Sequence, residues 1–255
     1  MRIWAIAVAA GLGAILVAAP VLAAPTVYVY SVMHPTYGRI GTLTDTVDHS
    51  ADGMRIDSQL RIAVKLVGIV VYRQDSDITE IMNGGKLISL ESVTDKDGQH
   101  LEVHGKAEFG GFAVNATGGS FTGPATTAPS SPWLLKQTGR GTLVYPSTGR
   151  IRDAQVSGGE FVTISLDGAP VSVRHFIVTG LNREDVWLDS AGIPVMFRSF
   201  EDGTPIDFVL QNALGAAAAA SLGAKTISAP PPPAPATISQ VAGRPLFHAS
   251  LTERA

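Results

Sequence analysis

Residues 54–66 read MRIDSQLRIAVKL, and this stretch decides the fold class. Apolar side chains occupy every second position from Met54 to Leu66, and the only break in that series is Ser58. Most of the positions between them are charged or polar. Alternation with a period of two is typical of a β-strand with one dry and one wet face. A strand of this length would span about 43 Å at about 3.3 Å per residue, so we expect it to curl around a core.

Turn signals recur at short intervals around this strand. Gly68 predicts a bulge or bend directly after it. Hairpin turns are predicted at Asn83-Gly84-Gly85, Asp95-Lys96-Asp97-Gly98, Gly110-Gly111, Gly118-Gly119, Ser147-Thr148-Gly149, Asp167-Gly168, Ser190-Ala191-Gly192 and Asp202-Gly203.

No amphipathic helical pattern appears between residues 26 and 210, so crossover helices are not expected. The sequence therefore predicts an all-β domain, an antiparallel meander of about eleven or twelve strands. A flat sheet of that size would expose long edges. We therefore expect it to roll into an open barrel, a half-barrel or a β-spiral.

Residues 1–23 have the features of a cleavable secretory signal peptide. Arg2 gives a positive start, residues 3–17 are uncharged, and Val21-Leu22-Ala23 has small or apolar residues at the two positions that a signal peptidase reads. The apolar stretch is shorter than the roughly 20 residues that span a membrane. We expect cleavage after Ala23, export of the chain, and no membrane-spanning segment in the mature protein.

Two regions follow the predicted signal peptide. Residues 24–210 are patterned throughout and are expected to form the β-rich domain. Residues 211–255 contain a stretch rich in Ala and Gly and then a proline run at 230–235. Such a segment buries little apolar surface, so it is predicted to be a disordered tail.

Composition excludes several classes of function. The formal net charge is −3 and no basic cluster is present, which argues against a nucleic-acid partner. The chain has no Cys, so disulfides, thiol catalysis and thiolate metal sites are excluded. No phosphate-binding glycine motif opens a helix, and no cofactor is expected.

Metal sites are also not expected. His100 and His104 are four residues apart on a predicted strand, which separates them by about 13 Å, too far to share one zinc ion. Surface histidines are the preferred interpretation. The segment that begins at Asp95 resembles the start of a calcium loop, but its twelfth position is Lys106 in place of the required Glu. A hairpin turn is preferred there.

Five residues are candidates for binding a ligand. His34 and Tyr37 lie in a Pro- and Gly-containing turn, where they either rim a cavity or form a structural corner. Tyr72 follows the apolar run after Gly68. Trp133 lies in the long loop 123–139. It either covers an apolar opening or anchors this loop to the core. His175 lies on an apolar strand parity and is either a hydrogen-bonded core residue or a general base.

Several segments resemble a family of exported bacterial proteins known as a domain of unknown function. They are His34–Gly41, Val64–Arg73, Ser92–Asp95, Val186–Asp189 with Gly192–Val195, and Glu201–Phe208. The resemblance covers the β-rich domain and implies no catalytic residues. More loosely, the Trp187–Val195 hairpin is similar to those of periplasmic β-spiral proteins, namely lipoprotein carriers and envelope-integrity proteins. That similarity implies an apolar interior and favours the periplasm.

Together these observations predict a non-enzymatic periplasmic protein. Its expected role is to bind a hydrophobic ligand (a lipid, an acyl chain or an apolar peptide) or to support the integrity of the cell envelope. The expected partner is a hydrophobic small molecule or a lipoprotein. The alternatives are an interaction protein that uses residues 211–255, and a hydrolase that uses His175 or His34; the absence of a Gly-x-Ser-x-Gly motif disfavours the hydrolase.

Overall fold

The computed structural model describes residues 24–50, 53–135, 137–166 and 168–215. The strands are β1 (Thr26–His34), β2 (Gly38–Ser50), β3 (Gly53–Leu66), β4 (Ile69–Asn83), β5 (Lys86–Lys96), β6 (Gln99–Glu108), β7 (Gly111–Ala116), β8 (Gly119–Pro124), β9 (Ala128–Pro129), β10 (Gly139–Val144), β11 (Ile151–Leu166), β12 (Ala169–Thr179), β13 (Arg183–Leu188), β14 (Pro194–Glu201) and β15 (Thr204–Gly215). A short 3₁₀-helix, η1 (Pro132–Leu134), lies between β9 and β10.

All fifteen strands belong to one sheet, which confirms the expected all-β class. The expected number of eleven or twelve strands was too low. Two of the additional strands, β9 and β10, lie wholly or partly in the loop predicted over residues 123–139. They are strands because their backbones pair with a neighbouring strand. Segments this short show no clear period-two pattern in the sequence.

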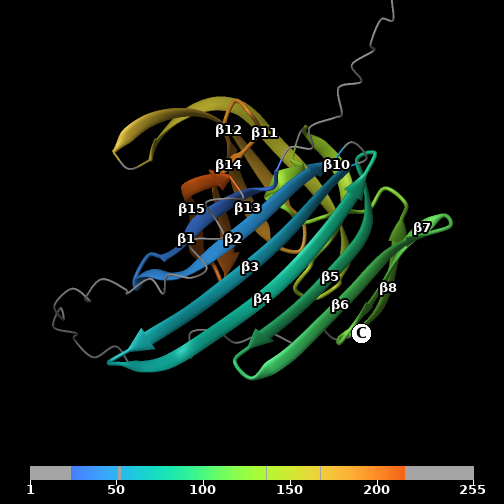
Figure 1. Ribbon diagram of the computed structural model, residues 1–255, viewed down its shortest axis with the longest axis horizontal. Helices are drawn as coiled ribbons and strands as arrows, with labels where there is room; N and C mark the ends of the chain where they lie inside the picture. Colours follow the sequence, from blue (N-terminus) through green and yellow to red (C-terminus); the bar gives the residue numbers. More distant parts are fainter. Residues whose placement is uncertain (1–23, 51–52, 136, 167, 216–255) are drawn as a thin grey trace, which may run out of the picture.

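The strands follow the order of the chain around the sheet. The order runs from β8 down to β1, continues with β15, and then descends to β9. Every neighbouring pair is antiparallel except β9 and β10. Figure 1 shows the result: the blue first strand lies beside the orange last strand, β2 to β6 cross the front, and β11 and β12 run behind.

The two edge strands of the sheet, β8 and β9, lie close to each other because the sheet is rolled. The edges β8 and β9 follow each other in the sequence, and the Thr127 amide donates to the Pro124 carbonyl (2.9 Å). A Cβ atom on Gly123 would lie 3.0 Å from the side chain of Ile151 in β11. Within the described residues no backbone ladder joins β8 to β9. The sheet is therefore rolled into an open barrel.

Strand β3 matches the predicted strand over residues 54–66, but the role predicted for Gly68 was wrong. Val67 and Gly68 both have positive φ (49° and 82°) and reverse the chain, so that β4 begins at Ile69. Two successive residues with positive φ form the hairpin turn whose twist matches that of the flanking strands. Gly68 thus belongs to a tight hairpin turn, where a bulge or bend was expected.

The last strand continues beyond the boundary expected at residue 210. Residues up to Gly215 remain in β15 because they pair with the start of β1, where Thr26 faces Gly215. The predicted signal peptide (1–23) and residues 216–255 of the predicted tail lie outside the described residues. Within the described part, no helix is long and apolar enough to cross a membrane.

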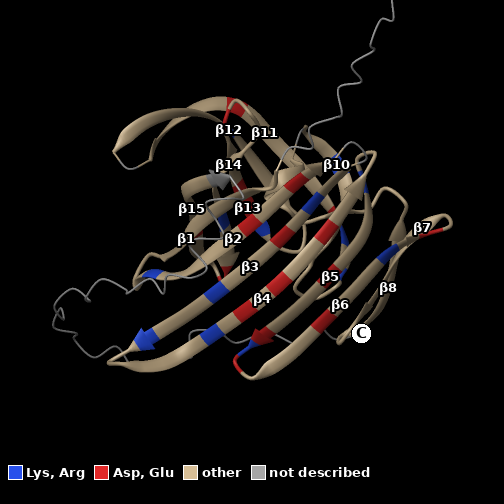
Figure 2. Ribbon diagram, viewed as in Figure 1, with Lys and Arg blue, Asp and Glu red and all other residues tan. Residues whose placement is uncertain are grey.

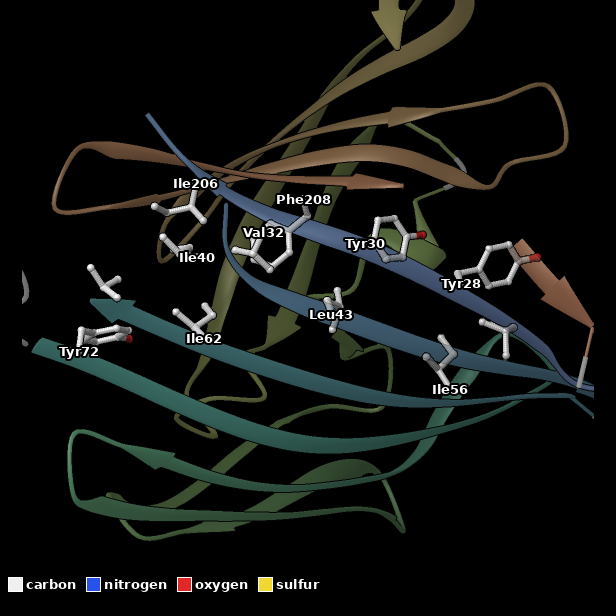
Figure 3. Packing of buried hydrophobic residues seen from close by; sticks show 12 residues of the cluster. Tyr28, Tyr30, Val32, Ile40, Leu43, Ile56, Ile62, Tyr72, Ile206 and Phe208 are labelled. Atoms are coloured by element: carbon white, nitrogen blue, oxygen red, sulfur yellow. The ribbon is translucent and has the colours of Figure 1, made fainter. Parts of the chain in front are cut away.

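The barrel interior contains three clusters of buried apolar side chains. The first gathers residues of β1–β4 and β15, including Tyr30, Leu43 and Phe208, and Figure 3 shows them converging from these strands. The second belongs mainly to β4–β7 and β10, and the third to β12 and β13. Much of the apolar face that was expected to line a groove is therefore covered by the protein's own side chains.

One segment connects all three clusters. We call residues 127–135, which include η1, the inner loop. Its consecutive side chains Trp133, Leu134 and Leu135 pack against the first, second and third clusters respectively. The inner loop thus fills the space that the rolled sheet leaves open.

Tyr30 connects β1, the central strand of the sheet, to the start of β14. Its side chain is fully buried, and its hydroxyl donates to the Pro194 carbonyl (2.9 Å) at the start of β14. Its ring lies edge-on to Phe197 (5.5 Å between centroids). A buried carbonyl that loses its donor is left without a partner, which is unfavourable.

We predict that Tyr30→Phe lowers the free energy of unfolding by about 1–3 kcal/mol, because Pro194 loses its donor while the ring packing is kept. Urea denaturation measures this change. Tyr37→Phe, at a half-buried ring whose hydroxyl makes no hydrogen bond to another described residue, should change stability by less than about 0.5 kcal/mol. Equal stabilities of Tyr30→Phe and the wild type would contradict the role of this bond.

Candidate functional site

Three acidic residues point into the barrel, where apolar side chains are expected. They are Asp45 in β2, Glu80 in β4 and Glu184 in β13. Asp45 and Glu80 are buried, and each shares its strand parity with interior apolar residues. An interior carboxylate needs hydrogen-bond donors, and the groups that approach these three residues come largely from the inner loop.

Asp45 receives the strongest of these contacts. The Trp133 indole nitrogen donates to Asp45 Oδ2 at 2.7 Å. Ser58, which faces Asp45 across the β2–β3 ladder, is a second polar neighbour of the carboxyl group. Ser58 is the one polar residue on the dry face of the predicted strand, and the structure places it beside the buried acid. Burial still raises the pKa of Asp45 to about 6.

Glu80 and Glu184 meet the two serines that precede the 3₁₀-helix. Ser131 is the polar neighbour of Glu80, and the Ser130 hydroxyl donates to Glu184 Oε1 at 3.2 Å. Burial raises the pKa of Glu80 to about 8 and that of Glu184 to about 7. Asp45 Oδ1 and Glu80 Oε2 are buried and have no hydrogen-bond partner among the described residues. At neutral pH Glu80 therefore carries a proton for much of the time.

A cavity of about 450 Å³ lies beside the inner loop. Its apolar lining comes from Tyr28, Met54, Trp133, Leu135, Leu188 and Ile193. The rings of Tyr28 and Trp133 are in contact, with centroids 4.6 Å apart. Trp133 therefore does both things that the sequence left open: it anchors its loop and it lines an opening.

The two charged side chains that line this cavity, Asp189 and Arg174, have different hydrogen-bond partners. Asp189 Oδ1 accepts hydrogen bonds from the amides of Ala191 (2.9 Å) and Ile193 (2.8 Å), so this carboxylate is occupied by its own turn. Arg174 donates through Nε to the Gly159 carbonyl (3.1 Å) and lies over the Phe176 ring. Arg174 forms no ion pair with a carboxylate among the described residues.

Of the other candidate residues, His34 and Tyr37 lie together. His34 is buried, and its Nδ1 accepts hydrogen bonds from the amides of Thr36 (3.0 Å) and Tyr37 (3.4 Å). Burial lowers the pKa of His34, in keeping with this acceptor role. The two rings are in contact, and Tyr37 packs against the first cluster. The imidazole thus closes the turn between β1 and β2.

Tyr72 is a buried residue of the first cluster. Its hydroxyl donates to Gln74 Oε1 (2.6 Å), and its ring lines a small cavity of about 70 Å³. That space is too small for more than one or two water molecules.

His175 lies away from the cavity, on the outer face of β12. Its Nε2 is 2.9 Å from Asp185 Oδ1, and its ring stacks on Trp187. Arg183 also donates to the Asp185 carboxylate. Within the described part of the chain the imidazole makes no hydrogen bond to a hydroxyl group. The contacts of His175 thus form a histidine–carboxylate–arginine network without a nucleophile.

Asp45, Glu80 and Glu184 were missed by the sequence analysis, although a signal was present. Asp45 lies between the inward-facing Leu43 and Val47 and Glu80 between Ile78 and Met82, whereas Glu184 has an apolar neighbour of its parity, Val186, on one side only. His100 and His104 are exposed and pair with Asp95, Glu91 and Glu102 on the outside of the sheet. No group of three metal-binding side chains is found among the described residues.

We predict that Glu80 makes the fold less stable as the pH rises. Its pKa lies above the ordinary value of 4.5, so the folded chain binds the proton more tightly. This contribution is complete below about pH 4.5 and is lost as the pH rises through about 8. Glu80→Gln removes the titration, so its Tm should fall clearly less than that of the wild type between pH 5 and pH 9 in thermal unfolding followed by circular dichroism.

Glu108→Gln is the matched control, because Glu108 is exposed and forms no salt bridge within the described residues. Its Tm should show the same dependence on pH as that of the wild type. Parallel curves for Glu80→Gln and the wild type would show that Glu80 does not titrate on folding.

Comparison with known proteins adds the family and the fold. No curated protein sequence matches the chain. The crystal structure of a beta-barrel-like protein of the domain of unknown function DUF1849 from Brucella abortus is similar, with a TM-score of 0.59 and 15% identity over 76% of this chain and 99% of that one. A DUF1089 family protein from Pseudomonas aeruginosa gives a TM-score of 0.37 and 13% identity over 60% of this chain and 87% of that one.

At such identities the likeness to the Brucella protein concerns the fold alone, and it agrees with the rolled sheet described above. The family is shown by sequence, since the model of one family matches residues 31–211, more than half of the chain. The expected membership in a family of unknown function is confirmed at this level. This protein belongs to the family described as a domain of unknown function, DUF6134.

Proposed function

We propose that this chain is an exported, non-catalytic binding protein that holds a hydrophobic small molecule in the cavity beside Trp133. The observation that carries the proposal is the apolar lining of that cavity, which six side chains form at the junction of β1, β3, β13 and the inner loop. Its volume of about 450 Å³ falls within the range of small-molecule pockets, about 300–1,000 Å³.

The charges of the cavity favour a ligand with an acidic head group. Arg174 is a lining cation with no carboxylate partner among the described residues, and His49 is a second basic side chain of the lining; Asp189 is the acidic side chain there, and its Oδ1 already accepts from two backbone amides. A guanidinium group binds a carboxylate through two parallel hydrogen bonds. An acyl chain that ends in a carboxylate combines both properties, and a chain of about twelve carbons suits the volume.

The environment of the two histidines supports a role without catalysis. His34 uses its Nδ1 to cap a turn, and His175 lies on the outer face, bonded to Asp185. A hydrolase built on either residue needs a nucleophile within about 3 Å of the imidazole. Placement in the periplasm and a part in envelope integrity follow from the predicted signal peptide and the sequence resemblance, and we include both in the proposal.

Binding should be visible in the fluorescence of Trp133. Dodecanoate, used below the concentration at which it forms micelles, should shift Trp133 emission in a saturable way. The signal should persist in Trp187→Phe and disappear in Trp133→Phe. Arg174→Gln should weaken dodecanoate binding about ten-fold or more, because it removes a charge-assisted hydrogen bond, and should leave the binding of dodecanol unchanged.

Calorimetric titration provides the second measurement, since it does not depend on Trp. Absence of saturable binding of both probes to the wild type would refute the cavity as a site for acyl chains. If Arg174→Gln weakens the binding of dodecanoate and of dodecanol equally, the role of Arg174 in recognising the carboxylate head group is refuted.

A further inference from the structure

The hairpin formed by β3 and β4 projects beyond the rest of the sheet. On one side β2 pairs with β3 only as far as Ile62, and on the other side β5 pairs with β4 only from Gln74. The last pair of buried side chains on the projecting part is Val64 and Tyr72. Beyond that pair lies a two-stranded tip, residues 65–71, which we call the finger.

The finger is apolar and exposed. Of the nine exposed large hydrophobic side chains among the described residues, five lie in its seven positions: Leu66, Val67, Ile69, Val70 and Val71. Val67 is 99% exposed and Ile69 is 69% exposed. Figure 2 shows acidic and basic residues along β3 and β4 but none in the turn that joins them. Clustered exposed apolar groups of this kind are typical of an interaction surface.

Val67 is also an unfavourable residue for its position in the turn. The two-residue turns at Gly84-Gly85, Asp97-Gly98 and Asp202-Gly203 have positive φ values similar to those of Val67-Gly68. Asn, Asp and Gly adopt this conformation readily, whereas a β-branched side chain does not. Because Val67 is almost fully exposed, no packing offsets the strain. Folding does not explain why this position is apolar.

We propose that the finger inserts into the surface of a lipid bilayer. Its apolar side chains occupy both faces of the ribbon and the turn itself, which suits a medium that surrounds the tip on all sides; a protein partner would cover one face. From the Val64–Tyr72 pair to the turn the finger is about 7–10 Å long. Apolar groups of peripheral proteins enter the boundary of head groups and acyl chains to about 5–10 Å.

The charges near the finger favour anionic lipids. Lys65 lies in the finger and Arg39 lies on β2 two residues beyond Gly41, toward the same end. Neither forms an ion pair with a carboxylate among the described residues. The acids on this part of β4 are already paired, Asp75 with Arg73 and Asp77 with Arg61. Asp97 and Glu201 also lie near Tyr72 at the base of the finger, and the Lys96 ammonium lies there with them, 5.9 Å from the centre of the Tyr72 ring. The two cations would lie at the level of the lipid phosphates.

Vesicle flotation tests the proposal, with the chain that begins at Ala24 and so keeps every described residue. The wild type should float with phosphatidylglycerol vesicles and several-fold less with phosphatidylcholine vesicles. The triple variant Val67→Asn/Ile69→Thr/Val71→Thr keeps residues suited to a hairpin and should be recovered at least about ten-fold less. Phe109→Ser, which removes an exposed aromatic side chain from a different hairpin, should float like the wild type.

The single variant Val67→Asn separates function from folding. It should raise Tm by a few degrees, because Asn suits the turn, and at the same time lower recovery with vesicles. A structural role would move both quantities in the same direction. The proposal is overturned if the wild type floats with neither lipid or if the triple variant floats like the wild type. Equal recovery on both lipids would overturn the part assigned to Lys65 and Arg39.

Neither outcome depends on the cavity. Wild type stripped of bound lipid on a hydrophobic resin keeps the finger and should float as before. Loss of flotation after stripping would show that a ligand in the cavity, and not the finger, carries the attachment, and would overturn the proposal.

Discussion

The hydrogen bond from the Trp133 indole to the buried carboxylate of Asp45 is the contact on which the interior depends. The sheet of fifteen strands is rolled around one interior, and the inner loop lies within it. Trp133, Leu134 and Leu135 of that loop each pack against a different apolar cluster. The carboxylates of Asp45, Glu80 and Glu184 fix the position of that loop. Charged carboxylates are unfavourable in a dry interior, and this cost of desolvation is the reason why the pKa values of all three residues are raised.

Much of the fold could be predicted from local patterns. The alternation over residues 54–66 identified β3, and most glycine-rich pairs marked real hairpins. The exception in the alternation, Ser58, proved informative, since it faces Asp45 in the interior. What local patterns do not contain is pairing between distant segments. The extent of β15 is set by β1, and β9 and β10 are strands because of their neighbours, so neither their number nor their ends could be obtained from periodicity.

The candidate site was harder to predict for the same reason. Trp133 was identified from the length of its loop, but its partner lies 88 positions away. Asp45, Glu80 and Glu184 become meaningful only when three strands and the inner loop are placed around one interior. His34 and His175, which a search for catalytic residues selects first, serve local purposes: one closes a turn and the other belongs to a surface network. The finger was visible in the sequence as an apolar run, yet its exposure follows only from the length of the neighbouring strands.

The pairing of the first strand with the last also governs how the chain can assemble. Each half of the meander grows by hairpins between neighbours, whereas β1 and β15 join residues as far apart as Thr26 and Gly215. Closing so long a loop is entropically unfavourable, and long-range strand pairing is slow. In a chain that is delivered N-terminus first, β1 waits with one edge unpaired until the last strand emerges. The most buried strand of the finished barrel is then the one exposed longest to aggregation, and a holding chaperone would be most useful at that edge.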